Sequence, residues 1–306
     1  MFDMFENYNN DSKNSENQEN TAESSSSVSH FGNIFVISVG GSLLVKAKPD
    51  TEKIRAISEA ISILHSQGKK VVVVVGGGKV AREYVSACDS LEINNFDKDM
   101  IGISVTRTNA LLLANSIPEC HKEILTKISD AKKILDSGKI PVFGGLMPFF
   151  TTDAVGALIA ESLDATFVNL TNVDGVYTLD PRDYPDAKRY DEISYENLVS
   201  LVLSSGSKPG QNVVLDIACC MILQRSKIPA VVLDGNDIEN FKNYVNGYSF
   251  VGTIICETGQ EIDAQETTGK PARKGKTTKS KLKKAKKSKS SKYDDYETPD
   301  PSDIHF

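Results

Sequence analysis

The sequence of 306 residues lacks the features that would direct it to a membrane or a secretory route. No long apolar run occurs in it, and residues 1–31 contain no apolar stretch of signal-peptide length. A membrane-spanning helix needs about 20 consecutive apolar residues, and a signal peptide needs a shorter apolar core. We therefore expect a cytoplasmic protein with no membrane contact.

Motifs for metal binding are also missing. The five cysteines are not spaced as zinc ligands, and the four histidines are scattered along the chain. The adjacent pair Cys219 and Cys220 falls in an apolar helical stretch, which is typical of buried, reduced thiols in a cytoplasmic protein. The sequence thus indicates neither a metal cluster nor histidine-based catalysis, and it leaves any metal ligands unknown.

Two common nucleotide-binding fingerprints are absent as well. The chain has no P-loop of the form Gly-x-x-x-x-Gly-Lys-Ser/Thr, and it lacks the paired glycines and acidic residue of a dinucleotide-binding unit. The segment Gly76-Gly-Gly-Lys79 must therefore belong to a different phosphate-binding architecture.

The two ends of the chain differ in composition from its middle. Residues 1–31 are rich in Asn, Ser, Glu and Gln, and their few apolar residues cannot offset the entropy of ordering. Residues 265–292 hold twelve Lys or Arg against one acid, Glu266. We predict a disordered N-terminal extension over 1–31, a folded domain over 32–257 and a disordered tail over 258–306.

The positive charge of the Lys-rich segment, residues 265–292, masks a strongly negative net charge on the rest of the chain. The whole chain carries a net charge of −6, and this segment contributes +11, so the remainder carries −17. The segment is either a solvated low-complexity tail or an arm that docks on nucleic acid or another polyanion. No aromatic residues are interleaved among its lysines, so base stacking is not expected.

Between residues 32 and 257 the apolar pattern alternates between strand-like and helix-like periods. The pattern predicts strands over residues 34–39, 71–75, 140–143, 166–170, 229–233 and 252–256. Helices are predicted over residues 51–67, 99–116, 131–137, 194–204 and 212–226, and also after residues 79 and 151. Alternating units with short connections predict an α/β fold, with a mostly parallel central sheet and helices on both faces.

Three of the predicted strands end in glycine clusters, at residues 40–41, 76–78 and 144–145. Glycine lets backbone N–H groups approach an anion closely, and a following helix start adds a favourable dipole. A single glycine turn is also needed for tight strand–helix connections, so one alone would say little. Three in one sheet predict a site for more than one phosphate group, as in a small-molecule kinase.

The motifs, taken in their order along the chain, resemble those of the amino-acid kinase superfamily, and within it those of the archaeal type of uridylate (UMP) kinase. The matching segments are Gly40–Ser42, Gly76–Arg82, Asp99–Ile103, Thr106–Ala110, Pro141–Gly145, Thr151–Ala154, Asn172–Pro181 and Val214–Ala218. They cover nearly the whole folded part in the family's order.

The resemblance implies a three-layer αβα sandwich that transfers a phosphoryl group from ATP, with Mg²⁺, to UMP. It places the acceptor half at about 32–165 and the ATP half at about 166–257, and it implies a homohexamer. On the ATP side it implies Gly41, Ser42, Gly78 and Arg82 around the transferred phosphate, and Thr171, Tyr177 and Asp180 around the adenosine. On the UMP side it implies Gly77, Asp99 and the loop residues Leu146, Met147, Pro148, Phe149, Phe150, Thr151 and Thr152.

Simpler roles stay open for three of these residues. Arg82 is also readable as a solvated helix arginine, Asp99 as a helix N-terminal residue that favours the dipole, and Tyr177 as core packing. Many superfamily members carry a lysine where this chain has Ser38. Lys46 or Lys79 could supply that charge, although each also reads as a solvated surface lysine.

The acceptor loop departs from the family pattern Thr-x-Pro-Gly-x-Thr-Thr-Asp. Leu146 stands at the hydroxyl position and Phe149 at the glycine position, so we expect fewer donors and a hindered approach for a substrate phosphate. Three functions remain compatible with this loop. They are a UMP kinase, a superfamily kinase with another acceptor, and a catalytically weak nucleotide- or oxyanion-binding protein on the same fold.

Overall fold

The computed structural model describes residues 32–205 and 214–258, all of which belong to one unit, Met1–Pro271. The predicted N-terminal extension, residues 1–31, and the Lys-rich segment lie outside these described residues. The same holds for residues 206–213, which include the first two residues of the helix predicted over 212–226.

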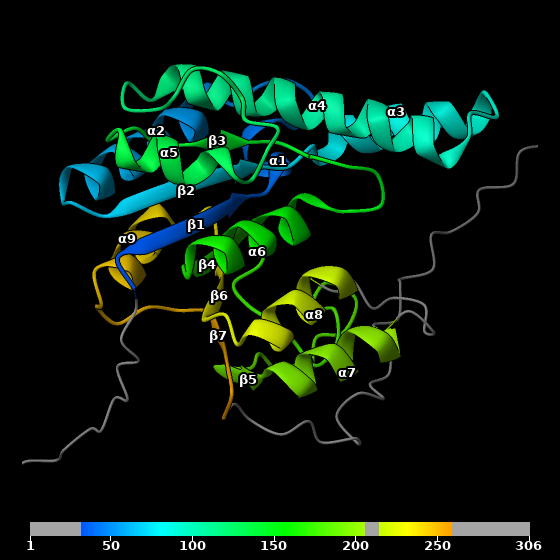
Figure 1. Ribbon diagram of the computed structural model, residues 1–306. Coiled ribbons are helices and arrows are strands. Elements are labelled where there is room, and N and C mark those ends of the chain that lie inside the picture. Colours follow the sequence, from blue (N-terminus) through cyan, green and yellow to red (C-terminus); the bar gives the residue numbers. More distant parts are fainter. Residues whose placement is uncertain (1–31, 206–213, 259–306) are drawn as a thin grey trace, which may run out of the picture. The chain divides into compact units, whose positions relative to one another are not determined.

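One sheet organises the described part of the chain, and its strand order is β3-β2-β1-β4-β6-β7-β5 (Figure 1). The strands are β1 (Ile34–Val39), β2 (Lys70–Val75), β3 (Val142–Phe143), β4 (Thr166–Thr171), β5 (Glu192–Ser194), β6 (Ala230–Asp234) and β7 (Thr253–Cys256). All neighbouring pairs are parallel except β6 and β7, which are antiparallel. The predicted mostly parallel α/β sheet is confirmed.

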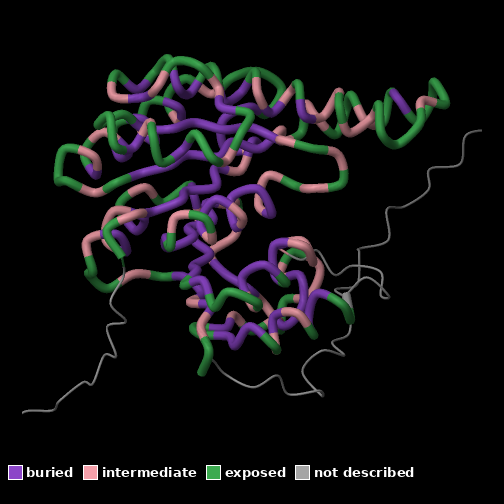
Figure 2. The backbone as a smooth tube through the Cα atoms, viewed as in Figure 1, coloured by how far each residue is buried: buried purple, intermediate pink, exposed green. Residues whose placement is uncertain are grey.

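Helices cover both faces of this sheet (Figure 1). One face packs against α1 (Gly41–Leu44), α2 (Thr51–Ser66), α4 (Asn95–Ser116) and α9 (Ile238–Val245). The other packs against α5 (Asp130–Asp136), α6 (Thr152–Leu163), α7 (Tyr195–Ser205) and α8 (Ile217–Ser226). The remaining helix, α3 (Gly78–Ser90), packs beside α4 and is largely exposed (Figure 2).

The five valines of β2 show why the sequence folds in three layers. Val72 and Val74 belong to one core, whereas Val71, Val73 and Val75 belong to the other, and all five are fully buried. A strand with helices on both sides buries successive side chains on opposite faces, so its sequence reads as an unbroken apolar run.

Several element boundaries differ from the predictions. The helix predicted from residue 99 begins at Asn95, because the Asn94 side chain accepts a hydrogen bond from the Asp97 N–H and caps it. The helix predicted from residue 212 begins only at Ile217, because the Asp216 carboxylate caps α8. The strand predicted over 140–143 keeps two residues, since Pro141 has no N–H to donate to a ladder.

Three short elements were not predicted: α1, β5 and α9. Each is eight residues or shorter, and a short element carries too few periodic positions to separate it from a loop. The cysteine prediction is confirmed, since all five thiols are free and only Cys256 is partly exposed. Among the described helices, none is both long and apolar enough to cross a membrane.

Candidate active site

The turns after β1 and β2 meet backbone against backbone at the carboxyl edge of the sheet. A Cβ atom on Gly41 would lie 2.2 Å from the Gly76 carbonyl oxygen, and one on Gly78 would lie 2.6 Å from the Ser42 nitrogen. Gly78 also has a φ of +63°, which glycine adopts without strain. Both turns lead directly into helices, so backbone N–H groups converge here as an anion site requires.

Helix α4 braces these turns through polar side chains that the sequence motifs contained without an assigned role. The buried Asn109 donates from Nδ2 to the carbonyl oxygens of Gly76 (3.0 Å) and Gly77 (3.3 Å). Thr106 Oγ1 accepts a hydrogen bond of 2.6 Å from the Gly145 N–H. The sequence offered one signal for this support. Thr106 and Asn109 are polar residues at helix positions that fall on the same face as apolar residues such as Ile103 and Leu113.

A cavity of about 310 Å³ opens beside the glycine turns of β2 and β3. Its wall contains most of the predicted acceptor residues, namely Gly77, Asp99, Met147, Phe149, Phe150, Thr151 and Thr152. It also contains Gly78 and Arg82, which were predicted to lie around the transferred phosphate on the ATP side. Leu146 and Pro148 do not line it, and Leu146 instead packs against the hydrophobic core. Gly41 and Ser42 lie outside the wall, across the turn from Gly78.

The acceptor loop is joined to α4 through Asp99. The Phe149 backbone N–H donates to Asp99 Oδ2 at 2.8 Å, so this donor is turned toward a carboxylate. Phe149 has a φ of +74°, the left-handed conformation that suits the glycine of the family pattern. Asp99 lies in the second turn of α4, which rules out the simpler role of an N-terminal dipole residue.

The cations near the site differ in their surroundings. Lys79 forms an ion pair with Glu83 (3.5 Å), and Lys46 forms one with Asp50 (3.6 Å), and both lysines are well exposed. These pairs support the interpretation of both as solvated surface lysines. Arg82, one turn into α3 as predicted, is exposed and lines the cavity.

Two carboxylates to which the sequence motifs assigned no role lie at the end of the acceptor loop, Asp153 next to Thr152 in the chain and Asp216 in contact with Thr151. Asp153 accepts a hydrogen bond of 2.7 Å from Ser38 Oγ, and Asp216 accepts one from Thr151 Oγ1. Asp153 keeps some solvent-accessible surface, but protein atoms surround its carboxyl group. This desolvation raises the pKa of Asp153 to about 6, and the neighbouring charge of Asp216 adds to the rise.

The Thr151–Asp216 contact also links the two halves of the chain. Thr151 caps α6 by accepting from the Ala154 N–H at 3.1 Å, while Asp216 caps α8 by accepting from the Ala218 N–H at 2.9 Å. The hydrogen bond between the two capping side chains therefore fixes the acceptor loop to the start of α8.

A second cavity, of about 140 Å³, lies where β4 leaves the sheet. The predicted residues Thr171, Tyr177 and Asp180 line it together with Asn172, Leu201 and Val214. The Asp180 carboxylate is only 3% exposed and is held by Arg182, whose Nε and Nη2 donate at 2.9 and 2.8 Å. Asp180 thus organises the turn at this cavity.

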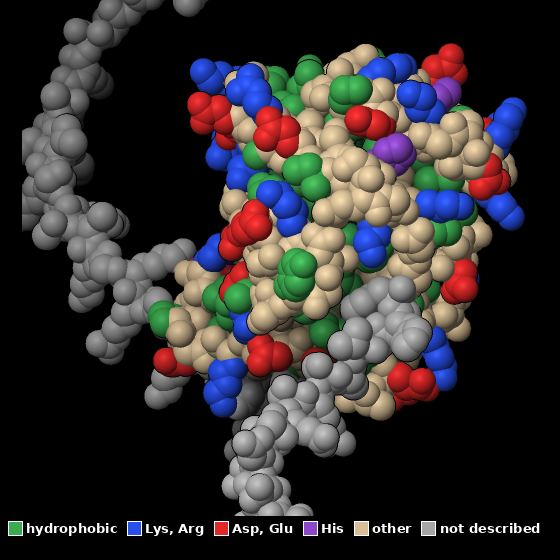
Figure 3. Space-filling view, turned by 90° about the vertical axis from the view of Figure 1, so that its left-hand side faces the viewer, with side chains coloured by type: hydrophobic (Ala, Val, Ile, Leu, Met, Phe, Trp, Pro, Cys, Tyr) green, Lys and Arg blue, Asp and Glu red, His purple; other side chains and the backbone are tan. Residues whose placement is uncertain are grey.

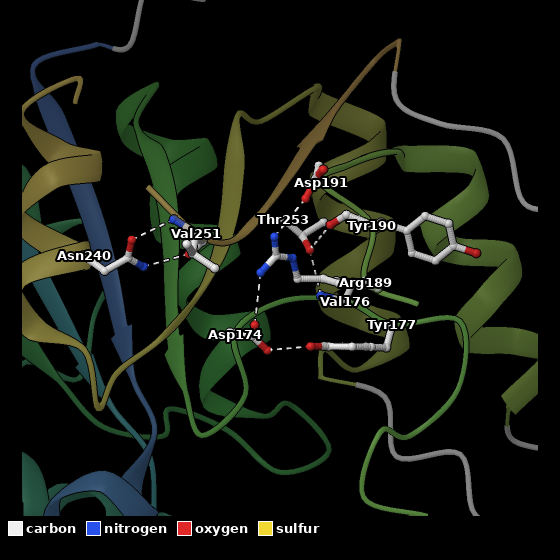
Figure 4. A network of polar contacts seen from close by, with 9 residues as sticks. All are labelled: Asp174, Val176, Tyr177, Arg189, Tyr190, Asp191, Asn240, Val251 and Thr253. Carbon is white, nitrogen blue, oxygen red and sulfur yellow. Dashed lines mark hydrogen bonds and ion pairs between the residues drawn. The ribbon is translucent and has the colours of Figure 1, made fainter. Parts of the chain in front are cut away.

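Tyr177 is half-buried and fixed by a polar network (Figure 4). Its hydroxyl donates to Asp174 Oδ1 at 2.8 Å, and Arg189 joins Asp174 (3.0 Å) to Asp191 (2.9 Å). Burial, followed by the Asp174 carboxylate, raises the pKa of Tyr177. Its ring therefore lines the cavity in a fixed position. Core packing, the simpler role considered for Tyr177 from the sequence, does not account for this position.

An αβα sandwich with three glycine turns at one sheet edge, between two cavities, is the architecture of a phosphate-handling protein. Residues 33–234 match the amino acid kinase family. This match spans well over half of the sequence, and the chain therefore belongs to that family.

Its relatives include curated proteins and solved structures. The uridylate kinase of Archaeoglobus fulgidus is 42% identical over 222 residues, which are 72% of this chain and 99% of that protein. The uridylate kinase of Pyrococcus abyssi is 41% identical over 214 residues, covering 69% and 95%. The crystal structure of the Archaeoglobus fulgidus enzyme aligns at 40% identity with a TM-score of 0.65, over 72% of this chain and 99% of that one.

A more distant structure shares the fold alone. The UMP kinase from Bacillus anthracis aligns with a TM-score of 0.64 at 23% identity, over 76% of this chain and 99% of that chain.

Proposed function

We propose that this protein transfers a phosphoryl group from ATP to UMP and so produces UDP in pyrimidine nucleotide synthesis. The observation that carries the proposal is the backbone contact between the turns at Gly41 and Gly78, which lies between the two cavities. The relatives that align over nearly their full length bear the name uridylate kinase.

The roles proposed for the residues follow from where they lie. Thr171, Tyr177 and Asp180 form the adenosine side, with Asp180 shaping the turn. Gly41, Ser42 and Gly78 offer backbone N–H groups to the transferred phosphate, and Arg82 reaches it from α3. Gly77, Asp99 and the loop residues Met147, Phe149, Phe150, Thr151 and Thr152 line the UMP side, with Asp99 directed at sugar hydroxyls. Leu146 and Pro148 complete this loop without lining the cavity.

This arrangement suits phosphoryl transfer, which asks the protein mainly to position the groups and to neutralise charge. A guanidinium such as that of Arg82 can contact phosphate oxygens in a bidentate manner. Within the described residues, no group of three or more His, Cys, Asp or Glu side chains is placed to hold a metal ion. Mg²⁺ is commonly held by nucleotide phosphates with one or two carboxylates, and we propose that it arrives with ATP.

An ADP-release assay tests the proposal with ATP, Mg²⁺ and, in separate reactions, UMP, CMP, AMP or no acceptor. We expect turnover with UMP well above that with CMP, AMP or no acceptor. ATP binding without turnover on any of them would contradict a kinase and favour a nucleotide-binding protein. Turnover that depends on a different acceptor would contradict the assignment of UMP.

Two further properties belong to the same proposal. Cell fractionation should find the protein in the cytoplasm, and sedimentation velocity should give the mass of a homohexamer, as the family resemblance implies.

The Lys-rich segment, residues 265–292, is proposed to bind polyanions in addition to the catalytic role. The face of the described residues shown in Figure 3 mixes acidic and basic side chains, so it offers no extended cationic surface. We expect the full chain to bind single-stranded RNA in a filter assay at low salt, and binding to fall steeply as salt rises. Deleting residues 265–292 should abolish binding and leave UMP turnover unchanged. Equal RNA binding by the deletion variant would contradict this role.

A further inference from the structure

The acceptor loop is held at both ends while one large side chain at its centre is left in solvent. Leu146 and Phe150 pack against the hydrophobic core, and the Phe149 N–H is bound by Asp99. Phe149, in contrast, is 83% exposed, and its ring lies nearly perpendicular to that of Phe150, with ring centroids 6.0 Å apart.

Phe149 also adopts a backbone conformation that is unfavourable for a residue with a Cβ. Its φ of +74° lies in the left-handed region, which bulky side chains rarely occupy. Burial of a large ring commonly offsets such strain, but this ring is not buried within the described part of the chain. A strained residue held by its surroundings is a reason to look for a function there.

The surroundings of Phe149 indicate what it could contact. The 310 Å³ cavity is lined by the turn residues Gly77 and Gly78 together with the cation Arg82. Phe149 and Met147, which is 44% exposed, line the same cavity, as do the apolar residues Val85 and Ile103. A ligand that fits this mixed lining carries both an anionic group and a flat apolar group.

Asp99 also lines this cavity and can serve both the loop and a ligand. Its Oδ2 atom accepts from the Phe149 N–H, whereas Oδ1 has no hydrogen-bond partner within residues 32–205 and 214–258. A sugar hydroxyl that donates to Oδ1 would place a base attached to the same sugar toward the Phe149 ring.

We propose that the Phe149 ring is the stacking surface for the base of the acceptor nucleotide and favours acceptors that carry a base over those that do not. The inference rests on the proposed function, because it concerns the acceptor site of the same kinase. Stacking on an aromatic side chain contributes about 1–3 kcal/mol per base. The family pattern has a hydroxyl and a glycine in this loop, and both are missing here. The stacking contact of Phe149 with the base would offset the loss of their contacts with the phosphate. An acceptor without a base does not gain this contribution to its binding free energy.

Calorimetric titrations of the full chain with UMP and with ribose 5-phosphate test this role, since the second ligand has the phosphate and sugar without the base. Phe149→Gly should weaken UMP binding about 5- to 140-fold, which corresponds to the stacking range at 1.4 kcal/mol per tenfold. The same variant should bind ribose 5-phosphate at least as tightly as the wild type does, because glycine does not hinder the approach of the phosphate. It should not lower the melting temperature, because glycine adopts φ +74° without strain.

Two variants serve as controls. Phe149→Trp keeps an aromatic surface and should retain tight UMP binding. Tyr248→Ala removes an aromatic ring that is 67% exposed and lies outside the cavity, and it should bind UMP as the wild type does.

The outcomes separate this inference from the proposed function. Unchanged UMP binding by Phe149→Gly, or equal weakening of both ligands, overturns the stacking role. So does a wild type that binds UMP no more tightly than ribose 5-phosphate. A fall in sedimenting mass in Phe149→Gly would show that the ring is a subunit contact instead. Turnover of UMP by the wild type tests the proposed kinase function, independently of the result for Phe149→Gly.

Discussion

Gly41→Ala is expected to abolish most of the phosphoryl transfer while leaving a folded protein. The added Cβ would lie 2.2 Å from the Gly76 carbonyl oxygen and 2.4 Å from the Gly78 nitrogen. Both atoms are backbone, so one turn must move, and the N–H groups that face the transferred phosphate move with it. Loss of one such donor lowers kcat by about 10²- to 10³-fold, and overpacking costs about 1–3 kcal/mol of stability.

The measurement is kcat for UMP together with the urea unfolding midpoint. Gly32→Ala is the matched control, because its Cβ would meet only the Asp164 carbonyl oxygen, at an ordinary 3.6 Å. The control should keep both values. A folded Gly41→Ala protein with wild-type kcat would show that the contact between the two turns does not position the reacting groups.

Asp153→Asn is expected to make the protein more stable at neutral and alkaline pH. The pKa of Asp153 is raised from an ordinary 3.8 to about 6, mainly by desolvation, so the folded state holds a proton more tightly than the unfolded state does. The free energy of unfolding therefore falls as the pH rises from 3.8 through 6. Above pH 6 the ionised carboxyl costs up to about 3 kcal/mol, which the amide does not incur.

Urea unfolding at intervals from pH 5 to pH 8 measures this difference. The gain in the free energy of unfolding of Asp153→Asn over the wild type should increase with pH and level off above about pH 6.5. Asp186→Asn, at an exposed residue, serves as the control. A variant that is less stable than the wild type at pH 8 would contradict the prediction. It would show that the Ser38 hydrogen bond outweighs the desolvation of the charge.

The sequence predicted the long elements because their packing is repeated along the chain. The helix with Ile54, Ile57, Ile61 and Leu64 and the valine strand β2 each bury several residues in a regular pattern. The ends of the elements depended on single side chains. Asn94 and Asp216 cap helices at positions where periodicity gives no signal.

The candidate site was predicted in part for a similar reason. Glycine clusters after strands are visible in the sequence, and the resemblance gave roles to residues such as Arg82 and Asp99. The support from Asn109 and Thr106 was not predicted, because they come within reach of the glycine turns only when α4 packs beside them. Phe149 was recognised as a departure from the family pattern, but its conformation and exposure were not foreseen.

The sequence by itself determined the alternation of strands and helices, the three glycine turns and the family to which the chain belongs. These features depend on neighbours along the chain and on residue types that permit only a few conformations. Only the tertiary structure decided that Gly41 and Gly78 touch, that Thr151 joins Asp216, and that Asp153 lies among groups that raise its pKa. Such contacts join segments that are tens of residues apart, and their distances arise only when the sheet brings the strand ends together.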